Sequence, residues 1–145
     1  MGYRRLFIMR KDLNMSPGKL ASQVSHCAEA YWTNMLRDVG KFECDGQYII
    51  SGFFVIKKDC FEQYICGTFT KTICEAKNKT QLMKATNIAQ ELGLIEGKDY
   101  GFIYDMCLTE LMPEEDDGTT LTGIWFCPLP DDVARTISKK YQLYK

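Results

Sequence analysis

Apolar and polar residues fall along the chain in blocks that predict strands and helices in turn. An apolar run inside residues 4–10 is typical of a strand that is covered on both faces. After it, Ser16 can cap a helix whose first turn accepts Pro17, and Gly40 supplies a stop. This pattern predicts a helix over residues 17–38.

Two stripes follow that helix, because residues three and four apart lie on the same helical face. The apolar stripe, which must face a sheet or another helix, consists of Leu20, Val24, Cys27 and Tyr31. A polar stripe at the same spacing consists of Lys19, Gln23 and His26. We expect the first stripe to pack and the second to be available for chemistry.

The remaining pattern is clear except over residues 41–66, where 48–56 indicate an apolar strand or hairpin arm. It predicts a strand over 68–74, a helix over 79–92, strands over 100–106 and 120–127, and a final helix beginning near 130–132. Alternating strands and helices favour an α/β, three-layer domain with helices on both faces of the sheet. We expect the sheet to be mixed, mostly parallel, and built of about four strands.

Composition limits the number of domains and the class of protein. The chain has 145 residues, 46% of them hydrophobic and 26% charged, which suits one globular domain over residues 1–145. The apolar run near the start is too short for a secretory signal or a membrane span. We therefore expect a cytoplasmic protein that does not enter a membrane.

The net charge and the cysteines limit the kinds of ligand and metal site that we expect. A formal net charge of −1 is not that of a general nucleic-acid binder, so any RNA contact must be local. Basic residues gather near the two ends, at Arg4, Arg5, Arg10, Lys11, Lys19, Lys139, Lys140 and Lys145. The seven cysteines are odd in number, partly inside apolar runs, and lack the close pairs of zinc sites. We expect free thiols, no metal and no cofactor.

Lys19 lies in the first turn of the predicted helix, where free N–H groups and the helix dipole favour an anion. A cation is electrostatically unfavourable there unless a negative group, such as a phosphate or a developing oxyanion, comes close. The alternative is an exposed lysine paired with solvent. Position alone does not decide between these interpretations.

Three further positions are candidates for a site. His26 is the only histidine and could exchange a proton, although a structural role is the more common explanation of a lone histidine. Asp105 falls near the carboxyl end of a predicted strand, with Thr109 just beyond it and Thr122 on the next strand. Strand ends border the binding crevice in α/β sheets, whereas loop capping is the alternative role for Asp105.

Three segments, in this order, resemble the peptidyl-tRNA hydrolase 2 family: MSPGKLASQVSHCAEA, YDMCLTELMP and TTLTGIWFCPLP. The first resembles the family's M-x-x-G-K-x-A-x-Q-x-x-H helix start, which contains Lys19, Gln23 and His26. The second resembles its D-x-x-x-T loop at Asp105 and Thr109. The third resembles its strand end at Thr122, Pro128 and Pro130, and KKYQLYK resembles its closing H-L-K-L-Y. Residues 41–56 have no counterpart and look like an insertion.

The resemblance implies metal-independent hydrolysis of the ester that joins a peptide to the terminal ribose of tRNA, with peptidyl-tRNA as partner and a homodimer left open. It implies that Asp105 orients water and that Lys19 stabilises charge or contacts phosphate. Gln23, Thr109 and Thr122 would supply hydrogen bonds, with His26 in support. The alternatives are a non-catalytic module that binds RNA or protein on the same fold, and a hydrolase of smaller esters.

The chain departs from the family pattern at two places. The family usually has D-A-G-R-T where residues 105–109 are DMCLT, so Leu108 replaces a basic residue. The family's glycine-rich I-G-P-G-P strand end is IWFCPLP here, which places the bulky side chain of Trp125 in a segment where the family has small residues. Both departures are expected to bear on substrate choice.

Overall fold

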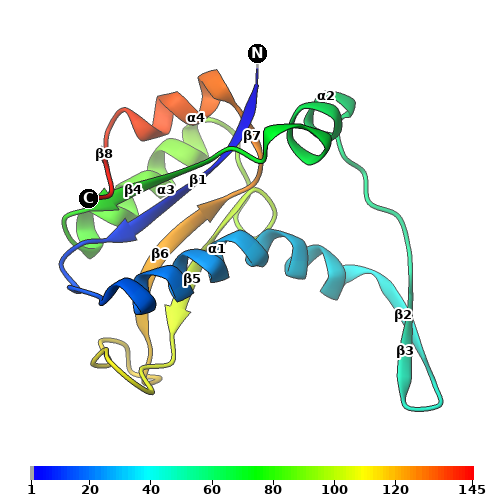
Figure 1. Cartoon of the computed structure of the whole chain (residues 1–145), viewed down its shortest axis with the longest axis horizontal. Helices are drawn as coiled ribbons and strands as arrows, with labels where there is room; N and C mark the ends of the chain where they lie inside the picture. Colours follow the sequence, from blue (N-terminus) through cyan, green and yellow to red (C-terminus); the bar gives the residue numbers. More distant parts are fainter. Residues whose placement is uncertain (1) are drawn as a thin grey trace.

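A six-stranded mixed sheet forms the centre of the computed structural model, which describes residues 2–145 (Figure 1). Its strand order is β5-β6-β1-β4-β8, with the short β7 paired to β1. The strands are β1 (Tyr3–Arg10), β4 (Lys71–Ala76), β5 (Tyr100–Asp105), β6 (Thr120–Phe126), β7 (Leu129–Pro130) and β8 (Gln142–Leu143). Four of these are long, and β7 and β8 have two residues each.

The expectation of a mostly parallel sheet is wrong. Only β1 and β4 are parallel, whereas β1–β6, β5–β6, β1–β7 and β4–β8 are all antiparallel. The physical reason lies in the connections, because a loop without a helix joins β5 to β6 and returns the chain in the opposite direction. Helices do lie in the connections from β1 to β4 and from β4 to β5, but β5 joins the sheet beyond β6, so β1 and β4 are the only parallel neighbours.

Helices cover both faces of the sheet, as expected (Figure 1). On one face lies α1 (Pro17–Asp38), whose Cys27 packs with Phe7, Met9 and Trp125 of the sheet. The apolar stripe of α1 is confirmed, since its other members pack against this cluster. On the other face, α3 (Lys79–Glu91) and α4 (Asp131–Ser138) pack over a larger cluster.

Arg5 on β1 joins α1 to the sheet from inside the molecule. Its buried guanidinium donates to the backbone carbonyls of Phe126 (2.9 Å), Cys27 (2.9 Å) and Ala28 (2.5 Å). Burial lowers the pKa of this group, and nearby thiol and phenol groups oppose the shift. Arg5 is therefore structural and does not belong to a basic surface.

Residues 41–66, where the sequence pattern was weakest, lie in a hairpin and a short helical segment. Strands β2 (Gly40–Cys44) and β3 (Gln47–Ser51) pair antiparallel and stand away from the sheet (Figure 1). The turn between them, Asp45-Gly46, has positive φ at both residues, which is the turn that two-residue hairpins prefer. The helical segment α2 (Lys58–Cys60) with the π-helix η1 (Phe61–Thr68) leads into β4 and was not predicted.

In residues 2–145, no helix combines the length and the apolar character needed to cross a membrane. All seven cysteines are free, and Cys27, Cys60 and Cys74 are buried, as their apolar surroundings predicted.

Candidate active site

The start of α1 places Lys19 beside the end of β5. Ser16 caps the helix, its hydroxyl accepting the backbone N–H of Lys19 at 3.3 Å. From the first turn, the Lys19 ammonium donates to Asp105 Oδ1 at 2.7 Å and to Thr109 Oγ1 at 3.3 Å. Lys19 is therefore not an exposed, solvent-paired lysine, because only 13% of its side chain is exposed. In the free protein, Asp105 is the anion that offsets its unfavourable place in the helix.

Asp105 is the last residue of β5 and the centre of the cluster. Besides Lys19, its Oδ1 accepts the Gln23 amide at 3.1 Å, and its Oδ2 accepts the backbone N–H of Cys107 at 3.0 Å. Burial opposes ionisation of this carboxyl, but the hydrogen bonds from Lys19, Cys107 and Gln23 outweigh it and lower the Asp105 pKa. The group is thus an ionised hydrogen-bond acceptor at neutral pH and a weak base.

Thr122 completes the cluster from β6. Its hydroxyl lies 2.7 Å from Gln23 Oε1, to which it donates, and 3.2 Å from the Ile103 carbonyl oxygen. The pairing of β5 with β6 shifts register between Ile103 and Tyr104, so that Thr122 is the extra residue of a β-bulge. This irregularity directs the Thr122 side chain toward Gln23 on α1.

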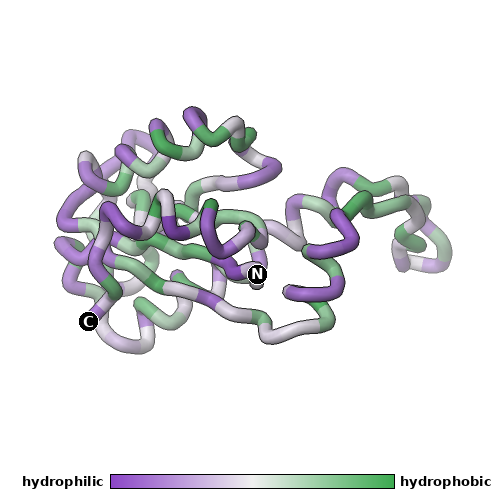
Figure 2. The backbone as a smooth tube through the Cα atoms, turned by 90° about the horizontal axis from the view of Figure 1, so that it is seen from above, coloured by the Kyte–Doolittle hydropathy of each residue, from purple (hydrophilic) through white to green (hydrophobic). Residues whose placement is uncertain are grey.

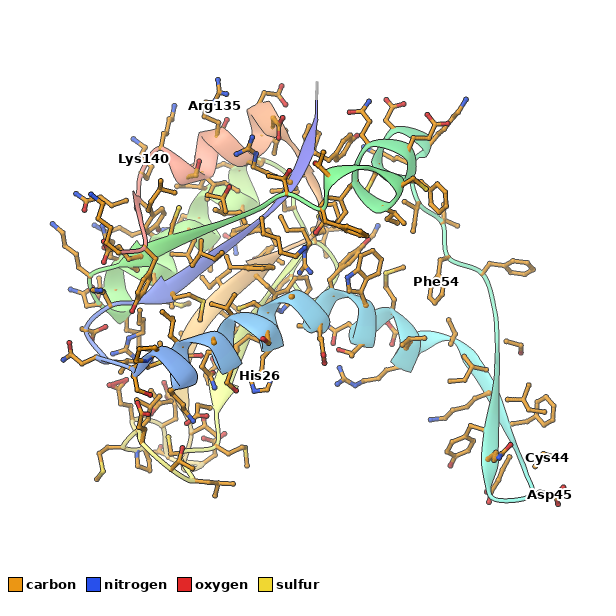
Figure 3. The ribbon with its side chains drawn as sticks, viewed as in Figure 1. His26, Cys44, Asp45, Phe54, Arg135 and Lys140 are labelled. Atoms are coloured by element: carbon orange, nitrogen blue, oxygen red, sulfur yellow. The ribbon has the colours of Figure 1, made fainter. Side chains whose placement is uncertain are left out.

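Five of the six predicted site residues therefore meet: Lys19, Gln23, Asp105, Thr109 and Thr122. The sixth, His26, does not join their hydrogen-bond network. It extends from α1 on the side of β5 and is exposed (Figure 3). It lines the same cavity as Lys19, and also the neighbouring cavity along α1, so it can reach a bound molecule but does not hold the cluster.

The cavity over the cluster measures about 520 Å³ and is open to solvent. Its polar wall contains Lys19, Gln23 and Asp105, whereas Tyr104, Met106 and Leu108 supply an apolar wall. Leu108 is 85% exposed, so the residue that replaces the family's basic side chain stands at the rim of this site. An anionic group and an apolar group can bind here side by side.

Trp125, the second departure, lies elsewhere. It is 2% exposed and packs in the core under α1, with its ring 6.2 Å from that of Tyr31. A Cβ on Gly101 would come within 2.6 Å of the Trp125 ring, so this glycine provides the space that the indole fills. Trp125 does not line the cavity around Lys19 and Asp105.

Two contributors to the site were missed by the sequence analysis. Cys107 has a φ of +58°, a left-handed conformation that directs its N–H to Asp105. Glu110 accepts hydrogen bonds from the backbone N–H and the hydroxyl of Ser16, which fastens the loop after β5 to the start of α1. A glycine in the family pattern at the position of Cys107 was the available signal for the first, and no local signal exists for the second.

Comparison with known proteins identifies the family. The sequence profile described as peptidyl-tRNA hydrolase PTH2 matches residues 3–144, which is nearly the whole chain. The chain belongs to the PTH2 family. Among its relatives, a peptidyl-tRNA hydrolase of Thermococcus onnurineus (strain NA1) is 23% identical over 141 residues, covering 97% of each chain.

The PTH2 match covers both sides of the cluster, from α1 through the loop after β5 to β6. It also covers the β2–β3 hairpin and the final strand. Within residues 2–145, no group of three or more histidine, cysteine, aspartate and glutamate side chains could hold a metal ion.

Proposed function

We propose that this PTH2 chain hydrolyses the ester of peptidyl-tRNA at the paired Lys19 and Asp105. Membership of the PTH2 family supports the type of reaction, and the hydrogen bonds around Asp105 support the place of the active site. The observation that carries the proposal is the 2.7 Å contact of an ammonium and a carboxylate at the floor of an open cavity.

Asp105 orients the attacking water. Ester hydrolysis requires water to approach the carbonyl carbon along one direction, and an ionised carboxylate fixes a water by accepting its hydrogen. Because Lys19 and Gln23 both donate to Oδ1, Oδ2 is the oxygen with capacity for a water hydrogen besides the Cys107 N–H. The lowered pKa makes Asp105 a positioning group and not a strong base.

Lys19 stabilises the negative charge that forms. As the water oxygen bonds to the carbonyl carbon, the carbonyl oxygen becomes an oxyanion, and an adjacent ammonium lowers the energy of that state. Collapse breaks the bond to the terminal ribose oxygen, and the proton lost by water ends on that oxygen. Thr109 fixes the Lys19 ammonium, and Thr122 fixes Gln23, so both donors are held before substrate arrives.

His26 contacts the substrate at the edge of the cavity. It lines both the cavity over Asp105 and the one that continues along α1 toward Arg37, so a long substrate passes it. The apolar wall with Leu108 then receives an uncharged part of peptidyl-tRNA beside the ester.

Purified wild-type chain should release tRNA from peptidyl-tRNA, and the Lys19→Ala and Asp105→Asn variants should each lose about 100-fold or more in kcat. Lys84→Ala is the matched control, because Lys84 is exposed on α3, across the sheet from α1. Circular dichroism should show all variants folded. Normal turnover in either site variant would contradict the location, and tRNA binding without hydrolysis by the wild type would contradict the reaction.

A further inference from the structure

A second cavity between α1 and β5 continues from the one over Asp105. It measures about 510 Å³ and shares His26 and Tyr104 with the cavity that contains Asp105. Its walls come from α1, β5, Trp125 of β6 and the Glu96-Gly97 segment before β5. Within residues 2–145, the β2–β3 hairpin, which extends away from the body at the right of Figure 2, adds nothing to these walls. The two cavities form one path, which we call the α1–β5 groove.

The length of the α1–β5 groove suits a short extended chain. Its inner end is the Lys19–Asp105 contact, and its outer end is where the Asn34 amide donates to the Gly97 carbonyl at 3.4 Å. At a rise of about 1.5 Å per helical residue, Lys19 and Asn34 are about 22 Å apart along α1. An extended peptide rises about 3.3 Å per residue, so the groove accommodates about six residues.

The β5 side of the groove is a free sheet edge. β5 stands at one end of the strand order, and among residues 2–145 the one strand paired with it is β6. The segment before β5 covers the edge only at its start, through the bridge between Glu96 and Tyr100. From Phe102 onward the described chain supplies no strand partner on that side. Such an edge is a template for another extended chain.

The backbone groups of Phe102 and Tyr104 point out from this edge. Just before β5, the Asp99 carbonyl accepts a hydrogen bond from the residue after β6, whereas the Tyr100 carbonyl faces the other way, toward Gly97. Backbone groups alternate along an antiparallel strand, so those of Phe102 and Tyr104 also face away from β6. The Phe102 ring packs on the opposite face of the sheet, beside Tyr100, so Phe102 borders the groove with its backbone.

The peptide part of the substrate fits an edge of this kind. All peptidyl-tRNAs share the peptide backbone, and hydrogen bonds from a strand edge recognise backbone and not side chains. With the ester held at Asp105, the carboxyl end of β5, the peptide extends back toward Phe102 and runs parallel to β5. We propose that the peptide of peptidyl-tRNA binds in the α1–β5 groove as an added strand, bonded to the backbone of Phe102 and Tyr104. This inference rests on the proposed hydrolysis at Asp105.

Charge favours the peptide over RNA as the occupant. Glu29 and Glu96 line the outer half of the groove, and their carboxylates repel phosphate. Arg37 lies in the same half, but its guanidinium donates to the Asn34 side chain at 2.7 Å. A different cavity, of about 570 Å³, is lined by Lys11, Lys77 and Lys140. Positive charge is thus available to the tRNA part outside the groove.

The length of the peptide tests the groove. Phe102 lies about 10 Å along β5 from Asp105, so a single amino acid on tRNA does not reach it, whereas about four residues do. With N-acetylated alanine peptides on tRNA, wild-type kcat/KM should rise by about 10-fold or more from one residue to about four, and then level off. Dissociation constants of analogues in which an amide replaces the ester should follow the same order without hydrolysis.

Methylation of single peptide amides tests the added strand. Two paired strands bond through alternate residues, and a methyl group removes the N–H donor. Methylation at alternate amides of the amide-linked analogue of about four residues should therefore weaken binding by about 5-fold or more, with little effect at the amides between them.

A protein variant can close the groove from the helix side. Thr33 of α1 lines its outer half, and Thr33→Tyr places a ring there. The advantage of peptides of about four residues over a single residue should then fall toward none. Ser25→Tyr is the matched control, because Ser25 is exposed on α1 and lines neither cavity. That variant should keep the advantage.

The outcomes separate the groove from the reaction. Equal kcat/KM and equal affinity at all lengths would overturn the groove and leave the hydrolysis standing. Amide analogues that bind in the expected order to a chain that hydrolyses no ester would support the groove and contradict the hydrolysis. Sensitivity at every amide, or at none, would overturn the added strand. A Thr33→Tyr protein that slows short and long substrates equally would place tRNA in the groove instead.

Discussion

Among single residues, the site depends on a carboxylate held by three donors from two segments of the chain. Lys19 and Gln23 come from α1 and the Cys107 N–H from the loop after β5, and all three bond Asp105. The family resemblance placed three of these residues, Lys19, Gln23 and Asp105, because the polar stripe and D-x-x-x-T are visible in the sequence. The conformation of Cys107 could not be predicted, because φ depends on where the loop must direct its N–H.

The pH dependence of activity follows from Asp105. Its folded-state pKa is lowered below the ordinary value of 3.8. The ionised form therefore stabilises the fold above the unfolded pKa, and this contribution is lost as pH falls through the folded one. We expect kcat/KM to stay constant between pH 7 and 5, because Asp105 remains ionised there, and to fall only below about pH 4. A loss of kcat/KM already between pH 7 and 5 would contradict the assignment of the pH dependence to Asp105.

Cys107 occupies a conformation that favours glycine. A side chain at φ +58° costs about 1 kcal/mol, which glycine does not pay. Cys107→Gly should therefore raise the free energy of unfolding by up to about 1 kcal/mol and keep hydrolysis, because the N–H to Asp105 is retained. Cys107→Ala is the matched control, since it removes the thiol and keeps the strain. Urea denaturation of both variants measures the difference, and equal stabilities would refute the strain.

Among helices and strands, hydrophobic periodicity predicted where the elements lie better than it predicted how the strands pair. The boundaries of α1 and the packing of its apolar stripe followed from residue spacing and from the Ser16 cap. Strand direction did not follow, because it depends on whether a connection contains a crossover helix, and short patterns around residue 110 do not show this. The strand or hairpin arm predicted over 48–56 overlaps β3, but its partner β2 was missed, although Asp45-Gly46 is a hairpin signal.

The β-bulge is the element-level feature that matters most for the site. It lies opposite the junction of Ile103 and Tyr104 and directs Thr122 toward Gln23. The carboxyl end of β5 and the start of β6 lie together because these strands are antiparallel. The expected crevice therefore forms, but for a different reason from the parallel arrangement that the sequence suggested.

Gly101 on β5 tests the packing between the sheet and α1. A Cβ there would lie 2.6 Å from the rigid Trp125 ring, so Gly101→Ala should lower the free energy of unfolding by about 1–3 kcal/mol. Gly18→Ala is the control, because a Cβ at Gly18 meets nothing within 4 Å and alanine favours the helix. Thermal denaturation of both variants compares them. A Gly101→Ala protein as stable as the control would show that the Trp125 ring can move aside without loss of packing.

At the scale of the whole molecule, the basic residues near the ends have separate roles. Arg5 is buried among carbonyls, and Arg10 is paired with Asp12 and Glu114, so neither contributes to a basic surface. Lys11 does approach the other end of the chain, where its ammonium contacts the Lys145 carbonyl. The number of these charges is visible in the sequence, but which of them are internal is not, because burial depends on the assembled fold.

If Lys19 and Asp105 act as one unit in hydrolysis, a double-mutant cycle on kcat/KM will show strong coupling between them. Lys19→Ala, Asp105→Asn and the double variant are compared with wild type in the release of tRNA from peptidyl-tRNA. We expect each single variant to lose about 100-fold or more, and the double variant to lose little beyond the worse single one. Losses that multiply, or a single variant with near wild-type turnover, would show that Lys19 and Asp105 do not act together.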